Sequence, residues 1–311
     1  MDVAAAAAHD LSTSRSDSST PVFIPAERED LFGIFTRPSR SANGVAVLAL
    51  PGGGSDPTFG KNQVRRRLAL ELADRGFSVL RMNYRGVAES GGAMREVDFG
   101  DPWTEDAIAA VRWLEAGGFD RIVIIGQCFG GRTAVATARH VRHLMGLALV
   151  GPPVRDVTHN EAILRRPLSW YLRRAISPRS LRLLFRSGGA QRRRQAVKTK
   201  IVRTVTGAGP PRQAGASLVF VDALKGALER RIPVLLLYGS TDDFYPDFEF
   251  VRTGPLAGVI ADAGDLVDVQ VVDARFGGMH NLSTQEIFVD SLVSWIDALV
   301  PTGNVVPAGR T

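Results

Sequence analysis

The sequence predicts an α/β protein built on a doubly wound, mostly parallel sheet, with an inserted helical cap. Short, continuous apolar runs, typical of strands buried on both faces, recur along the chain. They alternate with stretches whose apolar residues have helical spacing. A long, strongly basic stretch then interrupts this alternation. At 311 residues the chain has room for one large domain of this class with an insertion.

The elements follow from these patterns in chain order. Two short apolar runs at 22–24 and 31–35 predict a leading β-hairpin. The runs that predict strands of the parallel sheet lie at 45–50, 77–82, 121–125, 144–150, 234–238 and 267–272. The amphipathic stretches that predict helices lie at 62–75, 103–116, 132–141 and 284–299. Glycines follow several of these elements, as at Gly76 and at Gly117-Gly118.

The segment Ile-Ile-Gly-Gln-Cys-Phe-Gly-Gly at 124–131 carries the chain's only cysteine, Cys128. It has the pattern G-x-C-x-G, in which a buried strand turns sharply into a helix and presents a nucleophile. Gly126 and Gly130 would remove the Cβ atoms that such a turn cannot accommodate. A thiol at a helix N-terminus is favoured as the thiolate. The alternative is that Cys128 is simply a small buried apolar residue.

The composition of the chain indicates its cellular compartment and the character of its two terminal segments. A single cysteine excludes an intrachain disulfide and favours a reducing, cytoplasmic location. The apolar runs are too short for a transmembrane helix. Residues 1–20 are Ala-rich and then Ser/Thr-rich without a basic start, which predicts a disordered leader rather than a signal peptide. Residues 301–311 are expected to form a flexible tail.

The net charge of +6 is unevenly distributed. Residues 155–231 hold 18 Lys and Arg against 4 Asp and Glu, a net +14, so the rest of the chain carries −8. We therefore predict a basic cap or lid over 155–231, inserted into a core formed by 21–154 and 232–300. The arginines of the cap either face water or recruit an anionic partner.

Three further segments and a histidine match one family in order. Leu50-Pro51-Gly52-Gly53-Gly54 resembles the H-G-G-G oxyanion loop of the α/β-hydrolase superfamily. The segment Asn-Tyr-Arg-Gly-Val-Ala-Glu-Ser at 83–90 resembles its D-Y-R-G-x-G-x-S loop, and Gly-Ser-Thr-Asp-Asp-Phe-Tyr-Pro at 239–246 resembles its acid loop. Gly-Gly-Met-His at 277–280 then supplies a histidine before the last helix.

The resemblance covers roughly 22–154 and 232–300, and it implies a catalytic triad. Cys128 would attack an acyl carbonyl, His280 would transfer the proton, and Asp242 would orient the imidazole. Asp243 is the neighbouring alternative to Asp242. The oxyanion hole would use the backbone N–H of Phe129 and that of Gly53 or Gly54.

The chain also departs from the family pattern. Pro51 stands where a histidine is common, Asn83 where Asp is common, and Ala88 where Gly is common. Cysteine replaces the usual serine, and the stretch 65–90 looks like small bacterial hydrolases of biosynthetic clusters, including exosortase-associated hydrolases. No His or Cys pair has metal-ligand spacing, and 52–54 lacks the Lys-Ser/Thr of a phosphate-binding loop. We expect no metal and no cofactor.

These observations predict a hydrolase or acyltransferase that acts on an ester or thioester through an acyl-cysteine. Candidate partners of the cap are an acyl carrier protein, a coenzyme A thioester or the anionic surface of a membrane. Nucleic acid is not expected, because the basic segment carries no recognisable binding motif. The alternatives are a lyase or cyclase that uses the same triad, and a binding protein of the same fold without catalysis.

Overall fold

The computed structural model describes residues 19–53, 57–156, 215–277, 279 and 281–300. Its centre is an eight-stranded sheet in the order β1-β2-β4-β3-β5-β6-β7-β8. The strands are β1 (Ser19–Pro25), β2 (Asp30–Thr36), β3 (Ala46–Leu50), β4 (Ser78–Met82), β5 (Ile122–Gln127), β6 (Leu144–Val150), β7 (Val234–Gly239) and β8 (Val267–Val272). Strands β1 and β2 pair antiparallel, as β2 and β4 do, and the pairs from β4 to β8 are parallel. The predicted fold class is confirmed for this core.

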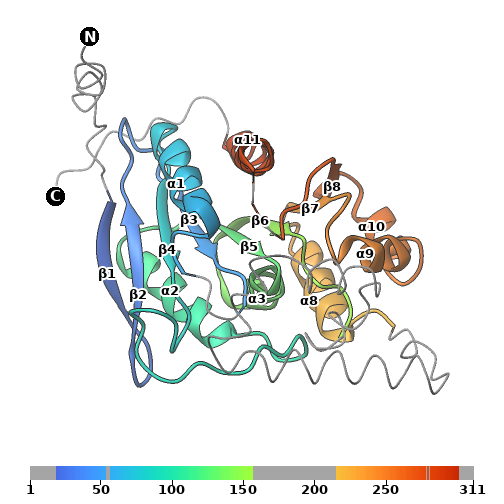
Figure 1. Ribbon diagram of the computed structural model, residues 1–311, viewed down its shortest axis with the longest axis horizontal. Coiled ribbons are helices and arrows are strands. Elements are labelled where there is room, and N and C mark those ends of the chain that lie inside the picture. The colour runs from blue at the N-terminus through green and yellow to red at the C-terminus, as the bar shows by residue number, and fades with distance from the viewer. Residues whose placement is uncertain (1–18, 54–56, 157–214, 278, 280, 301–311) are drawn as a thin grey trace, which may run out of the picture.

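Helices cover both faces of the sheet (Figure 1). The α-helices are α1 (Val64–Asp74), α2 (Thr104–Ala116), α3 (Phe129–Thr137), α8 (Leu218–Glu229), α9 (Tyr245–Arg252), α10 (Ala257–Ala263) and α11 (Leu282–Ala298). The 3₁₀ turns are η1 (Lys61–Gln63), η2 (Ala138–His140) and η3 (Gly264–Leu266). Helices α1 and α11 pack together on one face, whereas α2, α3 and α8 pack in a row on the other.

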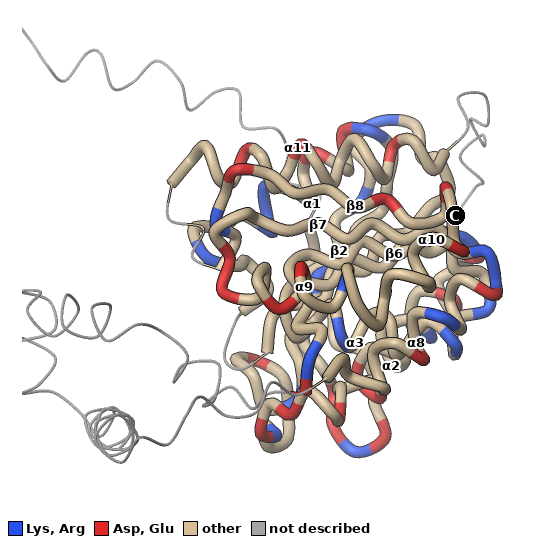
Figure 2. Tube along the Cα trace, turned by 90° about the vertical axis from the view of Figure 1, so that its right-hand side faces the viewer, with Lys and Arg blue, Asp and Glu red and all other residues tan. Residues whose placement is uncertain are grey.

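Two hydrophobic cores result, because successive side chains of a strand point to opposite faces of a sheet. On β3, Leu48 packs into the core under α2, α3 and α8, whereas Val47 packs into the core under α1 and α11. On β5, Ile124 and Val123 divide in the same way. Most charged residues lie at the periphery of the molecule (Figure 2). The continuous apolar runs of the sequence are therefore strands buried on both faces.

The boundary between core and cap differs from the prediction. Helix α8 lies inside the predicted cap range 155–231, yet it packs against α3 as part of the core. Its buried residues are Phe220, Val221, Leu224 and Ala227. These buried residues have helical spacing in the sequence. The range 155–231 was assigned to the cap on its net charge, which does not distinguish this amphipathic helix from the rest of the range. The part of the cap at 157–214 lies outside the described residues.

Two other boundaries also differ. Strand β1 begins at Ser19, inside the predicted leader, of which 1–18 lie outside the described residues, as the tail 301–311 does. The helix predicted over 62–75 begins only at Val64, because Asn62 and Gln63 have left-handed φ angles of 52° and 61°. Within the described part of the chain, no helix is both long and apolar enough to span a bilayer.

Candidate active site

Cys128 occupies a sharp turn between β5 and α3. Its backbone angles are φ 51° and ψ −118°, a region that residues other than glycine rarely adopt. The N–H of Cys128 donates to the carbonyl oxygen of Val150 at 2.8 Å, and its carbonyl accepts from the N–H of Gly131 at 2.9 Å. The surrounding sheet and helix thus hold a strained conformation, which is common at functional sites. The sequence predicted this turn from the glycine spacing alone.

The glycines on either side of Cys128 permit the turn. A Cβ atom on Gly126 would lie 2.2 Å from the carbonyl oxygen of Gly130. A Cβ atom on Gly130 would lie 2.3 Å from the carbonyl oxygen of Pro51. Both contacts are with backbone, which cannot move aside as a flexible side chain can. Any larger residue at these positions would open the turn and push the loop after β3 away from Cys128.

The loop after β3 approaches the start of α3 closely. A Cβ atom built on Gly53 would lie 3.0 Å from Cβ of Phe129. The N–H of Phe129 is the first of α3 and has no acceptor within the helix. The structure therefore brings together the two residues, Gly53 and Phe129, that the sequence assigns to an oxyanion hole. Gly54, the alternative to Gly53, lies outside the described residues.

Asp242 lies in the turn between β7 and α9 and is buried. Its Oδ2 accepts from the N–H of Gly239 and its Oδ1 from the N–H of Gly277, each at 3.0 Å. Burial raises the pKa of the Asp242 carboxyl, whereas the hydrogen bonds from Gly277 and Gly239 lower it and the charge of Asp243 raises it. A carboxylate has about four acceptor sites, so capacity remains for a further donor.

Asp243, the alternative acid, has a different partner and is more exposed. Its side chain is 40% exposed and pairs with Nη2 of Arg275 at 2.8 Å. Asp242 instead contacts the backbone of the loop between β8 and α11. The two neighbouring carboxylates therefore occupy different environments, one buried against the loop that leads to His280 and one at the surface.

A small pocket joins Cys128 to Asp242. Its volume is about 60 Å³. It is lined by Gln127, Cys128, Val150, Gly151, Asp242, Asp243, Phe244, Phe276 and Gly277. Gln127 also donates from Nε2 to the carbonyl oxygen of Phe276 at 3.4 Å, which links the turn after β5 to the loop after β8. His280 lies outside the described residues, but its neighbours Met279 and Asn281 are described.

The loop at 83–90 packs against the start of α3. Tyr84 is fully buried, and its ring lies 5.0 Å from Trp103 and 6.4 Å from Phe129. The hydroxyl of Ser90 donates to the carbonyl oxygen of Asn83 and accepts from the N–H of Phe32. The loop thus packs against Phe129, the first residue of α3.

Ala88 in this loop has a left-handed φ of 50°, where the family pattern has glycine. This conformation costs an alanine roughly 1–2 kcal/mol, and glycine adopts it without strain. We expect Ala88→Gly to raise the free energy of unfolding by about 0.5–1 kcal/mol. As a matched control, Ala109→Gly inside α2 should lower it by about 1 kcal/mol. Urea denaturation of both variants measures the two changes, and a loss of stability in Ala88→Gly would contradict the strain.

Arg132 ties α3 to both stems of the inserted segment. Its buried guanidinium donates to Asp156 Oδ1 and to Ser217 Oγ, each at 2.7 Å, and to the carbonyl oxygen of Pro153 at 3.0 Å. Arg155 and Ala216 form an antiparallel bridge beside it. The described residues on either side of 157–214 are therefore held at one place, beside α3.

The sequence gives little indication of some of these contacts. They include those of Arg132 and those of Lys61 and Asn62 on η1, which donate to the loop after β8. One feature of the sequence does point to Arg132. It is a charged residue within the apolar pattern of a core helix, and such a residue needs buried hydrogen-bond partners. Among the described residues, no cluster of three or more His, Cys, Asp and Glu is placed to bind a metal ion.

A family model described as serine aminopeptidase, S33, matches residues 61–247, more than half of the chain. The chain belongs to this family of α/β hydrolases. The matched range contains the turn at Cys128 and the carboxylate of Asp242, and it ends before His280. The family description specifies serine, whereas this chain carries cysteine between Gly126 and Gly130.

Solved structures share the fold. An esterase from Pyrococcus furiosus, Pf2001, superposes with a TM-score of 0.57 at 18% identity, over 92% of this chain and 92% of that chain. XC6422 from Xanthomonas campestris, described as an a/b serine hydrolase without lid, superposes with a TM-score of 0.54 at 16% identity, over 92% of this chain and 96% of that chain. An alpha-beta hydrolase from Vibrio vulnificus superposes with a TM-score of 0.57 at 18% identity, over 91% of this chain and 81% of that chain. A search of curated protein sequences finds no significant match.

Proposed function

We propose that this α/β hydrolase acts on an ester or thioester through a covalent acyl-cysteine on Cys128. The observation that carries the proposal is the position of Cys128, held at φ 51° between β5 and α3 and facing the pocket that also contains Asp242. A strained residue at this point presents its side chain at the carboxyl edge of the sheet. The free N–H groups and the dipole at the start of α3 favour a thiolate there.

The proposed reaction has two steps. The thiolate of Cys128 attacks the carbonyl carbon, and the oxyanion that forms is stabilised by the N–H groups of Phe129 and Gly53. Collapse breaks the bond to the leaving alcohol or thiol, which takes its proton from the imidazolium of His280. Water or another acceptor then attacks the acyl-cysteine while His280 accepts its proton, and release of the acyl group restores the thiolate.

Asp242 is the acid that we assign to His280. Its carboxylate is buried and bound to the N–H of Gly277, three residues before His280, whereas Asp243 pairs with Arg275 at the surface. An ionised carboxylate at Asp242 would fix the tautomer of the imidazole and stabilise its cation. The proposal thus uses the buried acid and leaves the exposed one as a surface ion pair.

The substrate class is tested by the products. Full-length protein is incubated with a panel of acyl thioesters, esters and lactones, with and without added amine or alcohol acceptors. Mass spectrometry then distinguishes addition of water from acyl transfer. The proposal expects turnover of at least one thioester or ester. A product formed without addition of water or acceptor would favour the lyase or cyclase alternative. Absence of turnover across the panel would favour a binding protein of the same fold.

The basic segment at 155–231 leads us to propose an anionic acyl donor, such as a thioester on coenzyme A or on an acidic acyl carrier protein. Its net charge of +14 would attract such a donor before the reaction at Cys128. The proposal also places the enzyme in the cytoplasm, whose reducing environment keeps Cys128 as a thiol. An anionic membrane surface is the competing partner for the same charge.

Salt dependence tests the anionic donor. Raising the salt concentration from about 50 to 200 mM should increase the KM for an anionic thioester several-fold, because the longer-range attraction is screened. Replacing Arg192, Arg193 and Arg194 with glutamine should reproduce part of this increase. The same charge change outside the cap, at the exposed Arg28, Arg40 and Arg142, is the control. A KM independent of salt, or binding only to anionic vesicles, would contradict the proposed donor.

A further inference from the structure

Side chains from two separate elements hold the backbone of the loop between β8 and α11. On η1, Nδ2 of Asn62 donates to the carbonyl oxygen of Met279 at 2.6 Å. On α11, Nε2 of Gln285 donates to the same oxygen at 3.0 Å. That carbonyl belongs to the planar peptide unit that joins Met279 to His280. Two donors therefore hold the carbonyl oxygen of Met279, the residue before His280 in the sequence.

The same loop is held at a second peptide unit. Nζ of Lys61 donates to the carbonyl oxygen of Gly277 at 2.8 Å. The N–H of Gly277 donates to Oδ1 of Asp242 at 3.0 Å. Gly277 is thus bound on one side by a residue of η1 and on the other by the proposed acid of the triad. A change at η1 can therefore reach both Asp242 and the Met279 carbonyl through this short loop.

Backbone strain is concentrated at both ends of the Asn62–Met279 hydrogen bond. Asn62 and Gln63 have φ angles of 52° and 61°, and Met279 has a φ of 48°. Asparagine tolerates this region, but glutamine and methionine rarely adopt it. Strained residues persist where surrounding contacts determine their conformation, and they cluster at functional sites. These residues with positive φ therefore lie at the contact between η1 and the loop.

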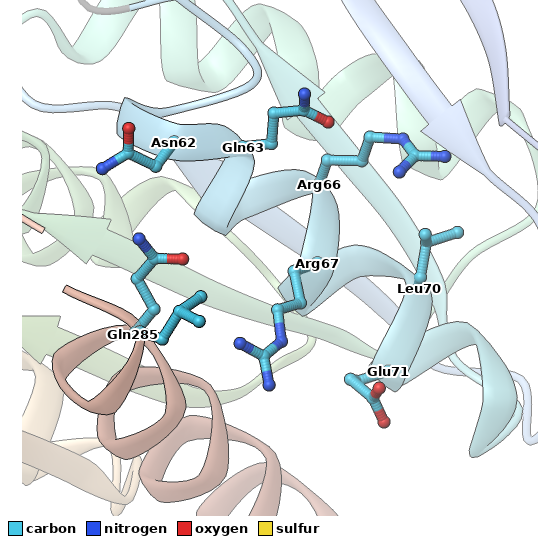
Figure 3. Close-up of a pocket in the computed structure, with 8 residues that line it drawn as sticks. Asn62, Gln63, Arg66, Arg67, Leu70, Glu71 and Gln285 are labelled. Atoms are coloured by element: carbon cyan, nitrogen blue, oxygen red, sulfur yellow. The ribbon is translucent and has the colours of Figure 1, made fainter. Parts of the chain in front are cut away.

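Asn62 and Lys61 are exposed, so these two donors can be changed without opening the core. Met279 and the third donor, Gln285, are buried. Figure 3 shows Asn62 and Gln285 at the same end of a groove between η1–α1 and α11, with Glu71 toward its other end. The groove has a volume of about 420 Å³. Arg67 lines it too, but lies 3.8 Å from Oε1 of Glu286 on the surface.

We propose that Lys61, Asn62 and Gln285 are positioning residues, which hold the carbonyls of Gly277 and Met279 and thereby support the action of His280 on Cys128. The inference rests on the proposed function, since it needs His280 to act on Cys128. A purely structural role would let these residues stabilise the fold without affecting the coupling between the thiol and the imidazole. The two roles differ in what a substitution at Asn62 changes.

The test uses Asn62→Asp in the full-length protein. Aspartate tolerates the same left-handed backbone, but its carboxylate cannot donate to the Met279 carbonyl and repels it. Asn62→Gly removes the donor without adding a charge and relieves the strain. Arg67→Gln is the matched control, because it lines the same groove. The readouts are the rate of Cys128 alkylation by iodoacetamide against pH, kcat and KM, and the melting temperature.

We expect Asn62→Asp to lower kcat at least about 10-fold with little change in KM. It should also move the midpoint of the alkylation profile toward pH ~8.5, the value of an ordinary thiol, in the direction that His280→Ala moves it. Asn62→Gly should move it less, and Arg67→Gln should leave both within about two-fold. If His280→Ala shifts the profile but both Asn62 variants only lower the melting temperature, this inference is wrong and the proposed function stands. An unchanged profile in His280→Ala would overturn both.

Discussion

Cys128→Ala is expected to lower kcat/KM for the best thioester or ester substrate at least about 10⁴-fold. The substitution removes the nucleophile, and the residual rate would come only from substrate binding and from the N–H groups at the start of α3. Steady-state kinetics on freshly purified, reduced protein measures the loss. Cys128 is half-buried and alanine keeps the same backbone, so the melting temperature should change little.

Cys128→Ser is the matched control for size and polarity. A serine hydroxyl keeps the shape of the site but must lose a proton during attack, so its rate should depend on His280 throughout. We expect kcat/KM of Cys128→Ser to lie between that of the wild type and that of Cys128→Ala. Retention of full activity in Cys128→Ala would show that the reaction proceeds without attack by this residue.

Asp242→Asn should lower kcat/KM about 10³- to 10⁴-fold, because an amide cannot stabilise the imidazolium and favours the wrong tautomer. Burial raises the pKa of Asp242, and only its ionised form can act. Activity of the wild type should therefore fall on acidification at a higher pH than for an exposed aspartate. A pH–rate profile of kcat/KM measures this limb, which Asp242→Asn should lack.

Asp243→Asn is the control at the neighbouring position. Its carboxylate is exposed and bound to Arg275, so its loss should change kcat/KM less than about three-fold. A larger loss in Asp243→Asn than in Asp242→Asn would reverse the assignment of the acid. Circular dichroism of both variants separates this outcome from misfolding, since Asp242→Asn also replaces an acceptor of two backbone N–H groups.

The central strands and the sharp turn could be predicted from the sequence because their signals are local. A strand buried on both faces reads as a continuous apolar run, and the turn at Cys128 needs glycine at Gly126 and Gly130 for steric reasons that depend only on near neighbours. The alternation of strands and helices then limits the fold to a doubly wound sheet. The sheet topology and the matched family confirm the fold class.

The other features of the fold and the site could not be predicted, because they depend on contacts between segments that are distant in the sequence. The resemblance favours Asp242 over Asp243 by its spacing, but their environments depend on the fold, because the loop after β8 brings the N–H of Gly277 to Asp242 while Asp243 pairs with Arg275. Helix α8 was missed because the basic residues around it concealed its apolar periodicity. Asn62 carried no signal, since its role requires residues more than 200 positions away in the chain.

The mass of the acylated protein tests the central claim most directly. Full-length enzyme is mixed with a slowly deacylating ester or thioester, quenched in acid and analysed by intact-mass and peptide mass spectrometry. We expect one acyl group per chain, located on the peptide that contains Cys128, at wild-type level in Asp243→Asn and absent in Cys128→Ala. Turnover of the same substrate with no adduct on Cys128, or with an adduct on another residue, would contradict it.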